Sequence, residues 1–319
     1  MFDVAADVTE GANSTTFVSE RSWTQVERLV LVAVLVLEMV LGVIGNSLTL
    51  LVKIMCRDRF PCKYWVPFVS LTLSDLCSSL LLTSGSLLAI LTKGQRSPWC
   101  EVVSLLKFVF ITSSIGSIAI LCVQRATGVA YTRSAVSHVM AMACPASWVT
   151  GVVFGSIPVV YHWIRYDQAE MLCAVFWMNS YSDMLVYILC TFSICIFLPF
   201  LLIISCSLVT AAGCGTSRDS DPDDLCSVTP LVVVFYLFCY TPFAVSELIL
   251  LGSLDLSPAP YWIRTLSSVM SYLDCVLNPI IYSTNRDFRE AGLALFWSTC
   301  RKSISLSDPV LTVMNRLEM

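Results

Sequence analysis

Charged side chains stand inside long apolar stretches of this sequence. Lys107 interrupts residues 102–123, which carry no other charge, and Asp75 lies in a similar stretch. A charge at such a position needs a partner from a neighbouring segment or a water-filled cavity. For Lys107 the candidates are Glu247 and an anionic group, such as a carboxylate, on a ligand. The residues leave both open, because a ligand can compete for an internal Lys107–Glu247 ion pair.

Catalytic patterns are missing from the sequence. It contains neither a His-Glu-x-x-His string nor a Gly-x-Ser-x-Gly string, and its only histidines, His138 and His162, belong to no zinc-spaced cluster. The net charge of −4 comes without a basic run, which disfavours nucleic-acid binding. No internal repeat of the kind expected in many transporters is visible. An enzyme and a transporter are therefore both disfavoured.

The composition indicates a protein that crosses a membrane several times. Of 319 residues, 56% are hydrophobic and 13% are charged, and the mean hydropathy is +0.77. A helix needs about 20 apolar residues to cross a bilayer. Seven stretches meet this length, at about 29–52, 64–92, 102–123, 139–161, 184–212, 227–252 and 262–283. The first is not expected to be a cleavable signal peptide, because polar, mixed-charge residues precede it and no small-residue cleavage site follows.

The distribution of lysine and arginine predicts an extracellular amino terminus. With this orientation twelve cations, including Lys53, fall in the inner loops and tail, against six outside. Asn13, in the string Asn-Ser-Thr, is then an extracellular glycosylation acceptor. Of the 15 cysteines, only Cys100 and Cys173 lie outside the bilayer on the oxidising side. They are expected to form a disulfide that ties the third span to the loop before the fifth; the alternative is two free thiols.

The last span carries the most specific motif. It reads Asn-Pro-Ile-Ile-Tyr at 278–282 and is followed by Asn-Arg-Asp-Phe-Arg at 285–289, while Arg125 lies 25 residues after Cys100. With these landmarks the chain resembles the rhodopsin-like (class A) G-protein-coupled receptors over about residues 27–298. The resemblance implies an all-α plasma-membrane protein, a seven-helix bundle with a short amphipathic eighth helix. It also implies an extracellular ligand, and a heterotrimeric G protein and arrestin as partners inside.

The resemblance also sets the expected division of the chain. Residues 1–26 form an extracellular tail, 27–284 the bundle, 285–298 the amphipathic helix and 299–319 a cytoplasmic tail. Cys300, beside two cations, is a candidate for palmitoylation. The expected activation switch comprises Gln124, Arg125, Tyr240, Pro242, Asn278, Pro279 and Tyr282.

Several switch positions depart from the family pattern. The arginine of the third span usually follows an acid that pairs with it and holds the resting state, but here Gln124 precedes Arg125. Tyr240 stands where tryptophan is usual, and Ser207 where tyrosine is often found. The inner loop at 213–227 is short and acidic. These departures favour either ligand-independent activity or a second possibility, a receptor-like protein with weak or no G-protein coupling that acts as a partner or trafficking subunit.

The resemblance suggests two binding sites inside the bundle. Asp75, Ser114, Asp274 and Asn278 fall where the family surrounds a buried sodium ion, and oxygen ligands suit a hard cation. The alternative is a protonated polar network that only packs the helices, since two close carboxylates do not both stay ionised without a cation. Lys107 stands where amine-binding relatives have an aspartate. Its opposite charge argues against a cationic amine and suggests an anionic or lipid-like ligand.

Aromatic residues gather near the outer ends of the fourth and fifth spans. They are either an interfacial belt that anchors helix ends or the lining of a ligand entrance. The group comprises Trp163, Phe176, Trp177, Tyr181 and Tyr187. Phe176 and Trp177 are the candidates for ligand contact, together with Lys107 and Glu247.

Overall fold

The structure is a computed structural model that describes residues 24–56, 65–92, 98–127, 135–167, 172–175, 181–212, 228–253, 261–295 and 297. Its helices are α1 (Gln25–Met55), α2 (Trp65–Cys77), α3 (Thr83–Leu91), α4 (Pro98–Thr127), α5 (Ala135–Val160), α6 (Tyr181–Thr191), α7 (Leu198–Ala211), α8 (Thr229–Ser253) and α9 (Tyr261–Thr284). The π-helical segments Ser78–Leu82 and Phe192–Phe197 join α2 to α3 and α6 to α7, so each pair forms one rod. A further helix covers residues 286–295.

Six helical rods within the described residues are long and apolar enough to cross a membrane. They are Gln25–Met55, Trp65–Leu91, Trp99–Thr127, Met142–Val160, Asp183–Ala211 and Thr229–Ser246. The seventh predicted span is α9, whose 24 residues extend about 36 Å at 1.5 Å per residue, enough for a hydrocarbon core of about 30 Å. Buried polar side chains, among them Asp274 and Asn278, make α9 less apolar than the others. The expected seven-helix fold class is confirmed.

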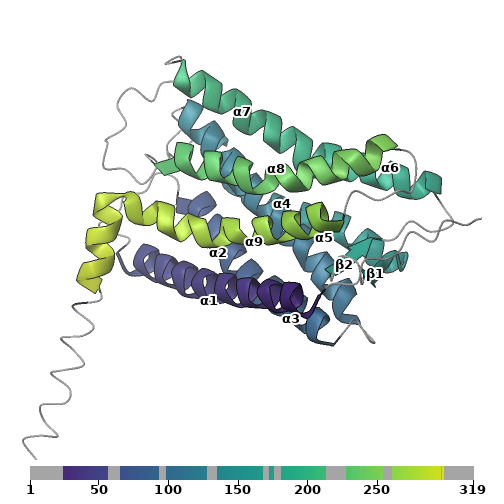
Figure 1. Cartoon of the computed structure of the whole chain (residues 1–319). Helices are drawn as coiled ribbons and strands as arrows, with labels where there is room; N and C mark the ends of the chain where they lie inside the picture. Colours follow the sequence, from purple (N-terminus) through teal and green to yellow (C-terminus); the bar gives the residue numbers. More distant parts are fainter. Residues whose placement is uncertain are drawn as a thin grey trace, which may run out of the picture.

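The two ends of the bundle are easily told apart (Figure 1). The helix at 286–295, in yellow, turns across one end, which we call the inner end. The strands β1 (Ile164–Asp167) and β2 (Leu172–Val175) lie at the opposite, outer end and pair antiparallel. This small hairpin is an addition to the expected all-α fold. It satisfies backbone groups of the loop between α5 and α6 that have no helical partners.

Apolar side chains both fill the bundle and cover its outside. The interior of the inner half is packed with fully or almost fully buried residues, including Phe68, Leu71, Ile118, Tyr236 and Tyr282. The outward faces carry exposed Leu48, Val152, Leu198 and Phe238. An apolar exterior of this kind is expected where helices face lipid rather than water. The outside of the bundle is therefore mostly apolar, while many polar side chains, among them Asp75 and Asn278, are buried in its interior.

Close contacts fix how the helices pack around α4, which contacts α2, α5 and α7. A Cβ on Gly151 of α5 would lie 2.7 Å from Val109 Cα of α4, so only glycine allows this approach. On the other side of the bundle, the Asn46 Nδ2 group donates to the Cys275 carbonyl at 2.8 Å and joins α1 to α9. A Cβ on Gly45, next to Asn46, would lie 3.0 Å from the Pro279 ring.

Candidate functional site: a polar column inside the bundle

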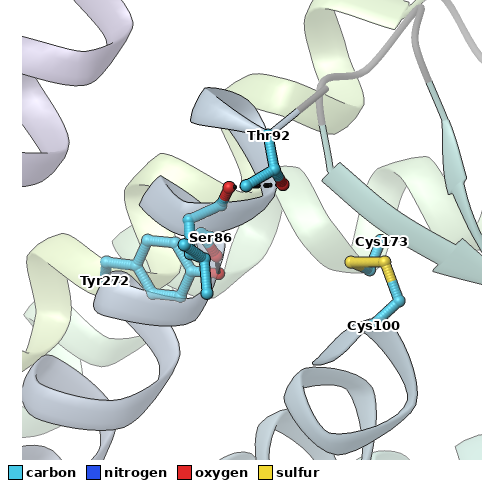
Figure 2. Close-up of a disulfide and its surroundings, with 6 residues drawn as sticks. Ser86, Thr92, Cys100, Cys173 and Tyr272 are labelled. Atoms are coloured by element: carbon cyan, nitrogen blue, oxygen red, sulfur yellow. Dashed lines mark hydrogen bonds between the residues drawn. A yellow bond between two sulfur atoms is a disulfide. The ribbon is translucent and has the colours of Figure 1, made fainter. Parts of the chain in front are cut away.

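A disulfide between Cys100 and Cys173 holds the outer end (Figure 2). Their Cα atoms are 5.3 Å apart, and Cys100 lies in the first turn of α4 while Cys173 belongs to β2. The predicted bond is therefore present. Nearby, the hydroxyls of Ser86 on α3 and Tyr272 on α9 form a 2.9 Å hydrogen bond. These crosslinks fix the rim of the bundle above the interior polar groups.

Lys107 lies between three helices in the outer half of the bundle. Its side chain is half-buried, and Nζ donates a 3.2 Å hydrogen bond to Ser268 Oγ of α9. The same nitrogen lies 5.7 Å from the centroid of the Phe243 ring on α8, within the range of a cation–π contact. Lys107 therefore connects α4 to both α8 and α9. Neither Ser268 nor Phe243 was expected from the sequence.

Several predicted ligand contacts lie outside what the structure describes. Glu247 belongs to α8, one turn beyond Phe243, but its side chain is not among the described ones. The predicted Lys107–Glu247 ion pair therefore stays a prediction. Phe176 and Trp177 lie outside the described residues, as do the modification sites Asn13 and Cys300.

Two of the outer aromatic residues have a packing role. Trp163 is 6% exposed and Tyr187 is 8% exposed, so neither projects into an interface with lipid or water. Their rings make an edge contact with centroids 5.7 Å apart, which packs the chain after α5 against α6. The Tyr187 hydroxyl also donates to the Phe154 carbonyl of α5 at 3.0 Å. Both residues therefore join α5 to α6 rather than forming an interfacial belt, and the lining of a ligand entrance stays a prediction.

The four oxygen-bearing residues of the predicted cation site are all buried inside the bundle. Asp75, Ser114, Asp274 and Asn278 are each at most 3% exposed, and Asn278 Nδ2 donates to Asp75 Oδ2 at 2.9 Å. The carboxyl groups of Asp75 and Asp274 interact electrostatically. The structure therefore places Asp75 of α2 beside Asp274 and Asn278 of α9, while Ser114 of α4 is buried as well.

The unmet hydrogen-bonding capacity of this set suits a cation. Four acceptors lack a partner among the described residues: both carboxylate oxygens of Asp274, the Ser114 hydroxyl oxygen and Asn278 Oδ1. Buried polar atoms are seldom left unsatisfied, and an oxygen-only set suits a hard cation rather than a transition metal. Within the described part of the chain no three His, Cys, Asp or Glu side chains cluster around a common point. A cation here would therefore rely on hydroxyl and amide oxygens as well as carboxylates.

The predicted switch residues outside the oxygen set lie in two groups, the first of them on α4 and α8. On α4, Gln124 is 3% exposed and its side-chain oxygen has no partner among the described residues, while Arg125 is half-buried. On α8, Tyr240 lies two residues before Pro242 and stacks on Tyr236 with ring centroids 4.4 Å apart. The stack fills the position at which the family usually places tryptophan.

The second group surrounds Tyr282, which is fully buried. Its ring makes edge contacts with Phe68 of α2 and with Phe288 of the helix at 286–295, with centroids 5.7 and 6.2 Å apart. The Asn285 side chain accepts a 3.0 Å hydrogen bond from the backbone N–H of Phe288 and caps that helix. Tyr282 thus links α9 to its neighbours and to the helix that follows.

Lys53 corrects one expectation from the sequence. It was counted among the cations of the inner loops, but α1 extends to Met55 and Lys53 is 3% exposed inside the bundle. A signal for this position does exist. Lys53 lies seven residues after Asn46 and four after Thr49, so all three share one face of α1, and all three are buried. Lys107, the set of Asp75, Ser114, Asp274 and Asn278, and Lys53 together form what we call the polar column, and Lys53 is its member nearest the inner end.

Comparison with known proteins agrees with this architecture. The sequence model of the family described as "7 transmembrane receptor (rhodopsin family)" matches residues 45–282. Galanin receptor type 1 of Homo sapiens is 25% identical over 302 residues, which cover 89% of this chain and 86% of the relative. Pinopsin of Columba livia is 26% identical, covering 78% and 76%. The crystal structure of squid rhodopsin superposes with a TM-score of 0.71 at 18% identity, over 87% and 88% of the two chains, which shows a shared fold.

Proposed function

Because this chain belongs to the rhodopsin family of seven-transmembrane receptors, we propose that it binds an extracellular ligand at Lys107 and signals to heterotrimeric G proteins. The family is one of receptors and not of enzymes. The proposed location is the plasma membrane with the amino terminus outside. Arrestin is proposed as a second inner partner.

One observation carries the proposal for the ligand site. Lys107 contacts Ser268 on α9 and the Phe243 ring on α8, so a single side chain on α4 links three helices. Its positive charge repels a cationic amine and attracts an anionic group, such as a carboxylate on a lipid or a peptide. A ligand bound there changes the contacts of all three helices at once.

Through these contacts, ligand binding at Lys107 can change the positions of α8 and α9 at the inner end. α8 contains Pro242 and α9 contains Pro279, and a proline inside a helix removes one backbone hydrogen bond and permits bending. A ligand favours the helix arrangement to which it binds more tightly. Occupancy near Lys107 therefore shifts the positions of α8 and α9 relative to α4.

The test is a signalling screen in cells that express the chain. Ligand-free activity is measured first, across the main G-protein classes and arrestin recruitment, followed by a panel of anionic lipids and anionic peptides. Lys107→Ala is expected to abolish the response to an active anionic compound while surface expression persists, and Lys107→Arg, which keeps the charge, should retain part of it. An equal response in Lys107→Ala would refute the ligand site. Collapse of surface expression would instead favour a structural ion pair.

A second candidate function is supported by a different observation. Gln124 occupies the position of the acid that usually pairs with Arg125, and its side-chain oxygen has no hydrogen-bond partner among the described residues. The acidic loop at 213–227 lies outside the described residues. Both features suit a receptor-like protein with weak coupling that serves as a partner or trafficking subunit. Silence in every signalling channel would favour it.

The buried oxygen set adds a proposed cation site to either function. Asp75, Ser114, Asp274 and Asn278 would hold a sodium ion, which would offset one of the two carboxylate charges. The observation that supports the site is the set of unsatisfied acceptors on three of these residues.

A further inference from the structure

Lys53 is a buried cation that the proposed function does not use. Its Nζ donates to Thr72 Oγ1 at 2.7 Å and to the Phe68 carbonyl at 3.2 Å, both on α2. The same nitrogen lies 4.8 Å from the centroid of the Phe68 ring and 4.4 Å from that of the Tyr282 ring. One ammonium thus joins α1 to α2 and to the inner end of α9.

The surroundings of this nitrogen suit a charged ammonium. An ammonium has three donors and no acceptor, and here it meets two oxygen acceptors and two aromatic rings. A cation within about 6 Å of an aromatic centroid is attracted by the ring, more strongly where water is excluded. The Asp75 carboxylate adds an electrostatic attraction. Lys53 is therefore held in place from α2 while its charge acts on Tyr282.

The position of Tyr282 makes this contact a restraint on α9. Above it, Pro279 packs directly against Gly45 of α1, and Asn46 bonds the Cys275 carbonyl. These contacts hold α9 against α1 as far as the proline. Tyr282 follows the proline by three residues, so its ring moves with any bend of α9 there. Such a bend separates the Tyr282 ring from the ammonium of Lys53.

We propose that Lys53 is a positioning residue that locks Tyr282, and with it the inner end of α9, in the arrangement described here. This rests on the proposed function only in that α9 is expected to move during signalling. The lock acts from α1 and α2. It therefore restrains the receptor independently of Arg125 on α4, whose usual acidic neighbour is replaced by Gln124.

The direct test measures the position of α9 and needs no G protein. Nitroxide labels are attached through p-acetylphenylalanine at Met55 and Ser283, exposed residues near the inner ends of α1 and α9. Distances between the labels are measured by pulsed electron paramagnetic resonance on the full chain in lipid nanodiscs. The native cysteines and the disulfide stay intact, and a receptor that does not signal still gives a result.

The native protein is expected to show one dominant distance. Lys53→Met should populate a second distance. The population at this distance should be roughly fivefold to thirtyfold larger than in the native protein, as expected for loss of a buried cation–π contact. Lys53→Arg should stay close to the native distribution. Loss of the ammonium leaves the Phe68 carbonyl paired, because Thr72 Oγ1 still donates to it at 2.8 Å. Identical distributions for the native protein and Lys53→Met would overturn the proposal.

A second measurement keeps Lys53 in place, so it gives a result even if Lys53→Met does not fold. Phenylalanine with zero to three ring fluorines replaces Tyr282. The Tyr282 hydroxyl interacts with the Thr72 side chain, but every member of the series lacks this hydroxyl, so its loss does not affect the comparison between members. Each fluorine weakens the negative potential on the ring face, so the Tm of the protein with Lys53 should fall stepwise with fluorine number. In the Lys53→Met background, if that variant folds, Tm should not depend on fluorine number. No fall of Tm with Lys53 present, or equal slopes in both backgrounds, would refute the cation–π contact. A stepwise fall of Tm, together with label distances in Lys53→Met that equal the native ones, would support the cation–π contact but refute the lock.

Discussion

Replacement of Asp274 by asparagine should stabilise the protein without sodium and destabilise it with sodium. Asp274 is fully buried, lies near Asp75, and neither of its carboxylate oxygens has a hydrogen-bond partner among the described residues. Without a cation one of the two acids must be neutralised. Asparagine removes that requirement, because it is neutral, and its amide adds hydrogen-bond donors to a region where Ser114 Oγ and Asn278 Oδ1 have no partner among the described residues.

The magnitude follows from the contacts of the set. An unsatisfied buried polar group costs about 1 to 3 kcal/mol, and at the lower end of this range Asp274→Asn should gain about 1 kcal/mol in sodium-free buffer. At a sodium concentration about 100 times the native Kd, the native protein gains about 2.7 kcal/mol from binding. Loss of one charged ligand, at about 1.5 to 3 kcal/mol, weakens binding roughly tenfold to 150-fold. The variant then gains only about 0.3 to 1.4 kcal/mol at the same concentration.

The assay is thermal unfolding of the purified protein in mixtures of sodium and choline chloride at constant ionic strength. The stability curves of the native protein and Asp274→Asn should cross as sodium rises. Glu290→Gln is the matched control, because Glu290 is an exposed carboxylate on the helix at 286–295 that pairs with Arg286. Curves for the native protein and Asp274→Asn that run parallel, with no dependence on sodium, would refute the cation site and favour the protonated network.

Three further predictions concern the switch, the packing and the disulfide. Gln124→Asp should lower ligand-free signalling relative to Gln124→Asn, measured as second messenger per receptor at the surface; no difference would show that the missing acid does not set the resting state. Gly151→Ala should lower Tm and surface expression, at a cost of about 1 to 3 kcal/mol, because its Cβ would lie 2.7 Å from a backbone carbon of α4. Gly292→Ala is the control, since its nearest neighbour would be an ordinary 3.6 Å away, and equal losses in both would contradict the packing argument. Cys100→Ser and Cys173→Ser should each lower Tm, and the double variant should lose no more than either single one; additive losses would mean that the two residues act separately.

Much of the fold could be predicted because the membrane leaves few choices. Apolar stretches mark the part of each helix inside lipid, and backbone groups there must bond within the segment. The prediction of 102–123 therefore falls inside α4, which extends over Pro98–Thr127. The helix continues past the apolar stretch because its hydrogen bonds do not require lipid. The hairpin β1–β2 gave no comparable signal, since each strand has only four residues.

The candidate sites were predicted less completely, because side-chain direction depends on how helices pack. Asp75, Ser114, Asp274 and Asn278 were identified together through the family resemblance; all four are buried, and Asn278 donates to Asp75. Lys107 was identified by its charge, but Ser268 and Phe243 were not, since a serine and a phenylalanine are ordinary in an apolar helix. Their importance appears only when α8 and α9 are placed beside α4.

Lys53 shows why the polar column has to be understood as a whole. Its position at the end of an apolar stretch suggested a solvated cation, whereas its spacing from Asn46 put it on the buried face of α1. Once buried, its charge attracts Asp75, while Asp274 repels Asp75. A cation among these acids and the ammonium of Lys53 therefore compete for the same negative charge. If the proposed sodium ion binds, Asp75 would link its site to the proposed restraint on Tyr282, because any movement of Lys53 away from α2 would leave that carboxylate more dependent on another cation.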